Sequence, residues 1–400
     1  MTKRHAGRSR QPHESAPGRI TIRDPAELAE TIPYLLGFHP EQSLVVIGLD
    51  GPSVTVTARV DLDELGDSRV IQDVLDVLVN SGSHSLVAAI YSETDREPYR
   101  RPADGSGGFP AADVIEQLDI ACAHRELHLV DALLIRAGRF YSYLCADGDC
   151  CPAEGRALDG PSSVAAATAT YAGLVALRRR DDVARLLTPD ETDVRATLEP
   201  LIEGAENEMV AAVLDDSLAR YQRRWVRRFV GVIDRFDAGP PPEARPIAAD
   251  DAADDDPGAR STGRLAASEV AGLVVALTDT TVRDELWLRV DSNRLPTRPA
   301  DALWLELARR APEPYDAAPL FLFAWSQWRR GNGTLARFAV EQVLASDVGY
   351  SAARLLESAL DHGLDPRRTP RLDAREYRAR IAARRRLSVR VDPDVDARAS

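Results

Sequence analysis

The stretch "SLVVIGLDGPSVTVTARVDL", residues 43–62, holds two runs rich in β-branched residues on either side of Asp50-Gly51. An Asp-Gly pair between two such runs is a strong hairpin signal, because both residues accept the positive φ angles of a tight turn. We therefore predict two antiparallel strands here. The fold class depends on what the segments after this hairpin add to it.

Helical and strand patterns alternate after the hairpin. Residues 68–79 and 111–123 have helical spacing, and residues 84–92, 127–135 and 138–145 have the short apolar pattern of buried strands. The predicted order is β-β-α-β-α-β-β, which gives an α/β domain with a mixed sheet. Its two β-α-β units predict three parallel strands in the middle, with outer strands attached as antiparallel hairpin partners.

Composition divides the rest of the chain. The predicted units are a disordered basic tail (1–19), the α/β domain (20–160), a helical segment (161–236), an acidic disordered linker (237–264), a helical region with hairpins like those of tetratricopeptide repeats (265–365), and a mostly disordered basic tail (366–400). The linker is rich in proline and aspartate and poor in apolar residues, so it cannot bury enough surface to fold. The C-terminal region is therefore predicted to be all-helical.

Four stretches together resemble one family. They are "IPYLLGFHPEQSLVVIG" (32–48), "VTARVDL" (56–62), "SYLCADGDCCPAEG" (142–155) and "LFLFAWSQWRRGNGTLARFAVEQVLASDVGYSAARLLESAL" (320–360). The chain resembles the actinobacterial domain-of-unknown-function family numbered 4192, over roughly residues 20–365 without the acidic linker. This resemblance implies a lineage but no activity, so no catalytic residue can be transferred from it.

A second, local resemblance concerns residues 329–350. This stretch is similar to the second half of a tetratricopeptide repeat: Gly331 fits the turn between helices, Ala336 the small packing position, and Leu344 and Asp347 the end of the repeat. Val348 stands where proline is usual, and the tryptophan-containing start of the repeat is missing. We therefore predict helical hairpins near residues 320–350 rather than a repeat array.

Lysine usage excludes several enzyme classes. The only lysine is Lys3, in the N-terminal tail, so a folded site has no lysine for pyridoxal phosphate, for a P-loop nucleotide or for a kinase ion pair. We predict no cofactor. The chain carries a net charge of −13, which disfavours nucleic acid. It shows neither a secretory signal nor an apolar run that could span a bilayer, so we expect a cytoplasmic protein without a membrane partner.

Polar residues follow the predicted parallel strands at their carboxyl ends, where open α/β sheets usually bind ligands. We call this edge the predicted mouth. It gathers candidate catalytic His39, Asp61 and Glu93 and candidate ligand-binding Ser43 and Arg136, and the loop after it adds Arg96, Arg100 and Arg101 as a possible lid. These groups can perform acid–base chemistry or bind an anion. The structural alternative is that His39-Pro40 ends a helix and that Asp61 caps the next one.

Residues 145–155, "CADGDCCPAEG", contain three of the four cysteines. We expect this cysteine loop at the opposite end of the sheet, near Cys122, His124 and His128. Cys122, His124, Cys145 and Cys150 are then candidate ligands for a structural zinc ion. Cys151 is left out, because adjacent residues of an extended chain point to opposite sides. We favour a plain turn with reduced cysteines over this zinc site, and thiol redox chemistry is a further alternative.

Five arginines share one face of a predicted helix: Arg220, Arg223, Arg224, Arg227 and Arg228. Such a row can bind phosphate or nucleic acid, or it can be a solvated face, and the acidic net charge favours the second interpretation.

Two functions remain. The favoured one is a cytoplasmic interaction or regulatory protein, with a small-ligand or partner site on the α/β domain and helices that bind a protein partner. The alternative is a hydrolase or transferase that uses His39, Asp61, Glu93 and Arg136. We favour the first, because the chain holds no recognised catalytic motif.

Overall fold

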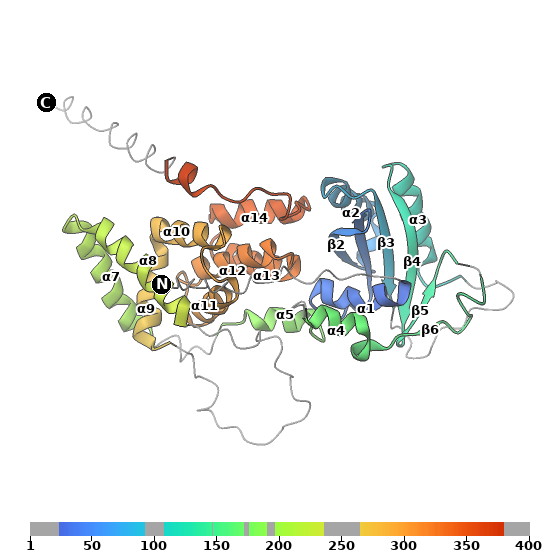
Figure 1. Cartoon of the computed structure of the whole chain (residues 1–400), viewed down its shortest axis with the longest axis horizontal. Coiled ribbons are helices and arrows are strands. Elements are labelled where there is room, and N and C mark those ends of the chain that lie inside the picture. Colours follow the sequence, from blue (N-terminus) through green and yellow to red (C-terminus); the bar gives the residue numbers. More distant parts are fainter. Residues whose placement is uncertain are drawn as a thin grey trace, which may run out of the picture.

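The computed structural model describes residues 24–92, 108–145, 147–171, 176–189, 197–235 and 265–379. These residues form an α/β lobe and a helical lobe that lie side by side (Figure 1). The predicted tail 1–19 and the predicted linker 237–264 lie outside the described residues.

The α/β lobe is built on a six-stranded mixed sheet. Its strands are β1 (Ser43–Asp50), β2 (Ser53–Asp61), β3 (Ser85–Tyr91), β4 (His128–Arg136), β5 (Arg139–Ser142) and β6 (Arg156–Ala157), in the order β2-β1-β3-β4-β5-β6. The α/β class and the hairpin β1–β2 are confirmed. The strands β2, β3 and β4 run in the same direction, as predicted, but β1 lies between β2 and β3 and is antiparallel to both, so the predicted position of β1 at the outside of the sheet is wrong. Only the β3–β4 pair is parallel among the described strands.

Residue types explain this strand order. The first six residues of β1 are buried, as suits a strand with neighbours on both sides, and its apolar run from Leu44 to Ile47 has no polar alternation. In contrast, β2 alternates valine with threonine and is partly exposed along its length, as suits an edge strand. The more apolar half of the hairpin therefore takes the interior position.

Helices cover both faces of the sheet. On one face α2 (Ser68–Asn80) and α3 (Ala112–Ala123) pack over strand residues such as Leu44, Ile90 and Leu134. On the other face α1 (Pro25–Leu36) packs over Val45 and Leu133. Successive strand residues point to opposite faces, so each strand contributes to two separate cores.

The remaining helices are α4 (Val164–Tyr171), α5 (Arg180–Leu186), α7 (Glu199–Leu214), α8 (Leu218–Arg235), α9 (Ala267–Thr278), α10 (Thr280–Asp291), α11 (Thr297–Arg310), α12 (Ala317–Arg329), α13 (Gly333–Ser346) and α14 (Ser351–Asp361). Those from α7 onward form the helical lobe around one core that includes Phe229, Trp304 and Phe321, all fully buried. The segment with α5 lies between the lobes (Figure 1).

The helices α12 and α13 form the predicted hairpin. Gly331 turns the chain with a φ of +87°, a conformation that glycine adopts without strain. Ala336 and Ala339 are fully buried, and their small side chains let the two helices approach closely. The all-helical C-terminal region is thus confirmed.

The predicted tail from residue 366 begins too early, because residues 366–379 are packed against the helical lobe. Arg329 donates to the carbonyl oxygens of Pro366, Thr369 and Pro370 at 2.8–2.9 Å. Tyr377 then donates to the carboxylate of Asp284. Long-range hydrogen bonds of this kind cannot be read from the basic composition of the segment.

The same segment joins the two lobes. Arg367 donates to the carbonyl oxygen of Val54 in β2 at 2.7 Å, and Arg368 pairs with Asp50 at 2.8 Å. Within the part of the chain that the structure describes, no helix combines the length and apolar character needed to cross a membrane.

Candidate functional site

The carboxyl edge of the sheet brings some residues of the predicted mouth together. Ser43 begins β1 and is the register partner of Asp61 in β2 and of Tyr91 in β3. His39 lies four residues before Ser43, is exposed, and donates its backbone N–H to Leu177 at 2.9 Å. The predicted residues Glu93, Arg96, Arg100 and Arg101 lie outside the described residues.

The sheet itself separates the other predicted mouth residues. Ser43 alternates with Leu44 and therefore shares the α1 face with Val45, whereas Arg136 shares the opposite face with Leu134. Arg136 is buried near Tyr141, which belongs to the core under α2 and α3; burial raises the pKa of Tyr141, and the charges of Arg139 and Arg136 oppose this rise. The sequence prediction placed these strand ends at one edge but did not consider the side on which each side chain leaves the sheet.

Asp61 has a partner that the sequence prediction missed. The Arg59 guanidinium donates to both carboxylate oxygens of Asp61, at 2.9 and 2.5 Å, and to the carbonyl oxygen of Glu41. The two residues are two apart on β2, so they leave the strand on the same face, and this spacing was the available signal. The predicted helix cap belongs to Asp67, which accepts from the backbone of Arg69, and not to Asp61.

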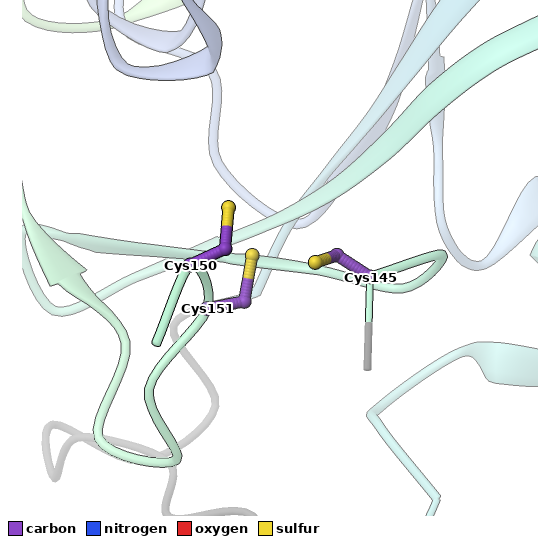
Figure 2. A group of neighbouring side chains, drawn as sticks. All are labelled: Cys145, Cys150 and Cys151. Atoms are coloured by element: carbon purple, nitrogen blue, oxygen red, sulfur yellow. The ribbon is translucent and has the colours of Figure 1, made fainter. Parts of the chain in front are cut away.

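The cysteine loop forms the tightest cluster of potential metal ligands. The sulfur atoms of Cys145, Cys150 and Cys151 all lie within 4.8 Å of one another. Figure 2 shows the Cys145 side chain directed toward Cys151, with the side chains of Cys150 and Cys151 beside each other. Among the described histidines, cysteines, aspartates and glutamates, these three alone form such a group.

Hydrogen bonds at both ends of the loop produce this convergence. Ser142 accepts the backbone N–H of Cys145 at 3.1 Å and donates to Asp131 of β4 at 2.9 Å, which fixes the start of the loop to the sheet. Asp147 accepts the backbone N–H of Cys151 at 2.7 Å through its carbonyl oxygen. The chain therefore turns back between Asp147 and Cys151 instead of extending.

Cys151 thus joins the cluster, and leaving it out was wrong. The expectation rested on an extended chain, in which neighbouring side chains diverge. In the turn, the side chains of Cys150 and Cys151 both approach Cys145 (Figure 2). Cys150 is exposed, and Cys145 and Cys151 are partly exposed.

The three thiols are not equivalent. A hydrogen bond from the Cys151 thiol, followed by a backbone hydrogen bond at Asp147, lowers the pKa of Cys145. Burial raises the pKa of Cys151 to about 12, and its hydrogen bonds with the other two thiols add to this effect. Cys145 therefore loses its proton more readily than Cys151 does.

Cys122 and His124 do not take part. Cys122 is 1% exposed in the core under α3, where burial raises its pKa to about 11, and His124 is exposed at the end of that helix. The loop lies instead beside the beginning of α3, because Tyr143 packs edge-on against Phe109 with 5.1 Å between ring centroids. β5 has only four residues, so the chain turns away before it reaches the other end of the sheet, where His128 begins β4.

A shallow hollow adjoins the thiol cluster. Cys151 and Pro152 form one side of it, and Phe109, Tyr141 and Arg156 form the rest together with Phe140 and Ser142. One member of the cluster therefore faces an aromatic surface with a positive charge at its rim.

The row of five arginines on α8 is partly used within the protein. Arg224 pairs with Glu208, and Arg228 pairs with Glu269 at 2.6 Å. Arg220, Arg223 and Arg227 are exposed on the same helix.

Comparisons with known proteins identify a family without a known role. The model of a family described as a domain of unknown function, DUF4192, matches residues 25–367. No curated protein and no solved structure matches the chain.

Proposed function

The chain belongs to the DUF4192 family, whose description gives no activity, and we propose a function from the geometry of its site. The α/β lobe binds a thiophilic metal ion such as Zn²⁺ at the cysteine loop. The protein acts as a binding or regulatory protein rather than as an enzyme. The observation that carries the proposal is the approach of three sulfur atoms to within 4.8 Å of one another.

The distances suit such an ion. Zinc bonds to thiolate sulfur at about 2.3 Å, so two sulfur ligands in a tetrahedral site lie about 3.8 Å apart. The three sulfur atoms need to move little to reach this separation. Thiolate is also the protein ligand that selects zinc or monovalent copper over magnesium and calcium.

The surroundings favour a regulatory or exchangeable site over a purely structural one. Structural zinc sites are closed by four protein ligands, whereas this cluster offers three ligands among the described residues. Cys150 is exposed, so an ion can enter and leave without opening a core. Ser142 and Asp147 hold the loop in place, which reduces the entropy that binding must overcome.

The same proposal includes a location and a partner. Three neighbouring thiols stay reduced in a reducing compartment, so we place the protein in the cytoplasm. A protein partner would then recognise the change that metal binding causes at the exposed loop. The alternative hydrolase or transferase at His39, Asp61, Glu93 and Arg136 gains no support, because Arg59 already holds Asp61 and Arg136 lies on the other face of the sheet.

The proposal is tested by zinc titration. The full chain, reduced and stripped of metal, is titrated with Zn²⁺ in competition with a chromophoric chelator, and Co²⁺ serves as a spectroscopic substitute that reports sulfur ligands. We expect one ion per chain and sulfur-to-cobalt charge-transfer absorption. Cys150→Ser removes an exposed ligand without disturbing the core, and should weaken binding at least about tenfold.

The matched control is Cys122→Ala, which removes the one cysteine that lies outside the cysteine loop, in the core under α3. It should leave zinc affinity unchanged. Absence of stoichiometric binding, or an equal loss of affinity in the control, would overturn the proposal.

A further inference from the structure

The hollow beside the cysteine loop is formed by tightly packed parts of the sheet edge. Phe140 and Tyr141 belong to β5, and Arg156 is the register partner of Phe140 in β6. Gly155 has a φ of +72° and packs so closely that a Cβ atom there would lie 2.5 Å from the Tyr141 ring. Arg139 donates to the backbone carbonyl oxygens of the two residues before Arg156, at 2.7 and 3.0 Å. These contacts fix the wall of the hollow that carries Arg156.

Positive charge exceeds negative charge around this hollow. Among the charges that act on Tyr141, those of Arg139 and Arg136 are positive and that of Glu154 is negative. Arg156 adds a third positive charge, and its exposed guanidinium forms no ion pair with any residue that the structure describes. A free guanidinium is a suitable partner for a carboxylate, because its N–H groups match the two carboxylate oxygens. The hollow therefore favours an anionic ligand.

The other side of the cysteine cluster is acidic. Asp147 and Asp149 are exposed in the turn that leads from Cys145 to Cys150. The charges around the cluster are thus divided, with carboxylates in the turn and guanidinium groups at the hollow. An anionic group that approaches the cluster is repelled on the first side and attracted on the second, where Cys151 lies.

Cys151 belongs to both the cluster and the hollow. Its sulfur atom lies within 4.8 Å of the other two, and the residue forms one side of the hollow. A zinc ion bonded to this sulfur at about 2.3 Å therefore lies next to the hollow. The described residues supply three sulfur ligands, which leaves the fourth position of a tetrahedral ion open. Thiolate sulfur is the ligand type that such a soft site prefers in that position.

We propose that the metal-loaded cysteine loop binds a small thiol that carries a carboxylate. The thiolate sulfur takes the fourth position on the ion, the thiol proton is released to solvent, and the carboxylate pairs with Arg156. This inference rests on the proposed metal site and names its ligand. The hollow offers about 270 Å³ of space, less than the roughly 300–1,000 Å³ that drug-sized ligands occupy, so the ligand is small. The ion holds it by its sulfur, and Arg156 selects it by its charge.

Titration of the cobalt-loaded full chain with small thiols tests the proposal. The chain is loaded with Co²⁺ without oxygen or thiol reductant, and mercaptoacetate, 3-mercaptopropionate or uncharged 2-mercaptoethanol is added. Sulfur-to-cobalt absorption should increase with each thiol, because each supplies a fourth sulfur ligand. Propionate, which has no sulfur, should leave the absorption unchanged. Cobalt per chain, measured after desalting, should stay at one throughout.

The decisive quantity is the ratio of the affinity for a carboxylate-bearing thiol to the affinity for 2-mercaptoethanol. Arg156→Gln should lower this ratio at least about threefold, because it removes an exposed ion pair and leaves the sulfur ligands in place. The affinity for cobalt should not change. The matched control is Arg69→Gln, which removes an exposed arginine from α2, the helix that follows β2 at the opposite edge of the sheet from β6. It should keep the wild-type ratio.

The outcomes separate this inference from the proposed function. A chain that binds no cobalt before any thiol is added contradicts both. If cobalt binds and the thiols leave its absorption unchanged, or remove the ion from the chain, the metal site stands and the fourth ligand is refuted. A ratio that does not fall in Arg156→Gln for either carboxylate-bearing thiol, or that falls equally in Arg69→Gln, refutes the selection by Arg156.

Discussion

The buried centre at Asp291 and the cysteine loop both bring polar side chains together, and they differ in how far their polar atoms remain accessible to a ligand. Asp291 is fully buried and accepts hydrogen bonds from Arg329 at 2.6 Å, Trp325 at 3.0 Å and the backbone of Leu372 at 2.6 Å. Arg329 uses its remaining N–H groups on three backbone carbonyls. The thiols of the loop, in contrast, contact mainly one another and remain accessible.

This difference distinguishes a polar centre that holds the fold from one that can bind. A buried charge is tolerated only when its partners are complete, and removing one partner leaves an uncompensated charge. A cluster at the surface with ligand atoms to spare contributes little to stability and keeps its bonding capacity for an ion. We therefore expect substitutions at the two places to affect different measurements.

The largest effect is expected for Asp291→Ala. Loss of the carboxylate leaves the Arg329 guanidinium, which is 11% exposed, without a counter-charge, and should lower the free energy of unfolding by about 3–5 kcal/mol. All five tryptophans lie in the helical lobe, so tryptophan fluorescence during urea unfolding reports this lobe selectively.

The control for this change is Asp361→Ala. Its ion pair with Arg337 is largely exposed, so its loss should cost about 0–1 kcal/mol. Equal destabilisation by both substitutions would break the comparison, because it would mean that burial and completed partners make no difference.

A smaller effect, visible as a trend with pH, is expected at Asp301. Burial raises the pKa of this carboxyl, while the Arg330 charge opposes the shift. A pKa above the unfolded value of about 3.9 means that the folded state holds the proton more tightly, so the stability contributed by Asp301 is lost as pH rises through the folded pKa. Asp301→Asn keeps an oxygen for Gln327 and Arg330 and cannot ionise.

Relative to the wild type, Asp301→Asn should therefore become more stable as pH rises from about 4 toward 7. Urea midpoints at several pH values measure this difference. A difference that is constant with pH would show that the Arg330 charge cancels the effect of burial, and the opposite slope would show that it outweighs burial.

The smallest effect on stability is expected in the cysteine loop. Cys150→Ser should change the free energy of unfolding of the metal-free protein by less than about 0.5 kcal/mol, because Cys150 is exposed. Circular dichroism during urea unfolding measures this for the whole chain. A large destabilisation without metal would assign the loop a structural role and remove the contrast with Asp291.

The sequence predicted the α/β lobe well where the pattern was local. The hairpin at Asp50-Gly51, the alternation of helices and strands and the C-terminal hairpin at Gly331 all follow from neighbouring residues. The position of β1 inside the sheet was mispredicted, although the apolar run from Leu44 to Ile47 indicates an interior strand. Strand order depends on comparing the burial needs of whole strands, and connectivity alone does not provide that comparison.

The site was harder to predict for two physical reasons. The alternation of side chains on β1 and β4 places Ser43 and Arg136 on opposite faces, and the strand ends alone do not show this. Cys151 joins the cluster because of the turn that the Asp147 carbonyl stabilises, and the spacing of the cysteines does not predict that turn. Arg329 and Asp291 are 38 residues apart in the sequence, so no local pattern predicts their ion pair.

The hydrogen bond from Arg367 to Val54 cannot form until the ribosome has synthesised both residues. It links residues 313 positions apart, so at about 5–20 residues per second a ribosome adds Arg367 about 15–60 s after Val54. During that interval the edge strand β2 has emerged while the group that covers its carbonyl has not yet been made. An uncovered edge is where strands of neighbouring nascent chains can pair. Once Arg367 has been made, its hydrogen bond covers the edge at Val54.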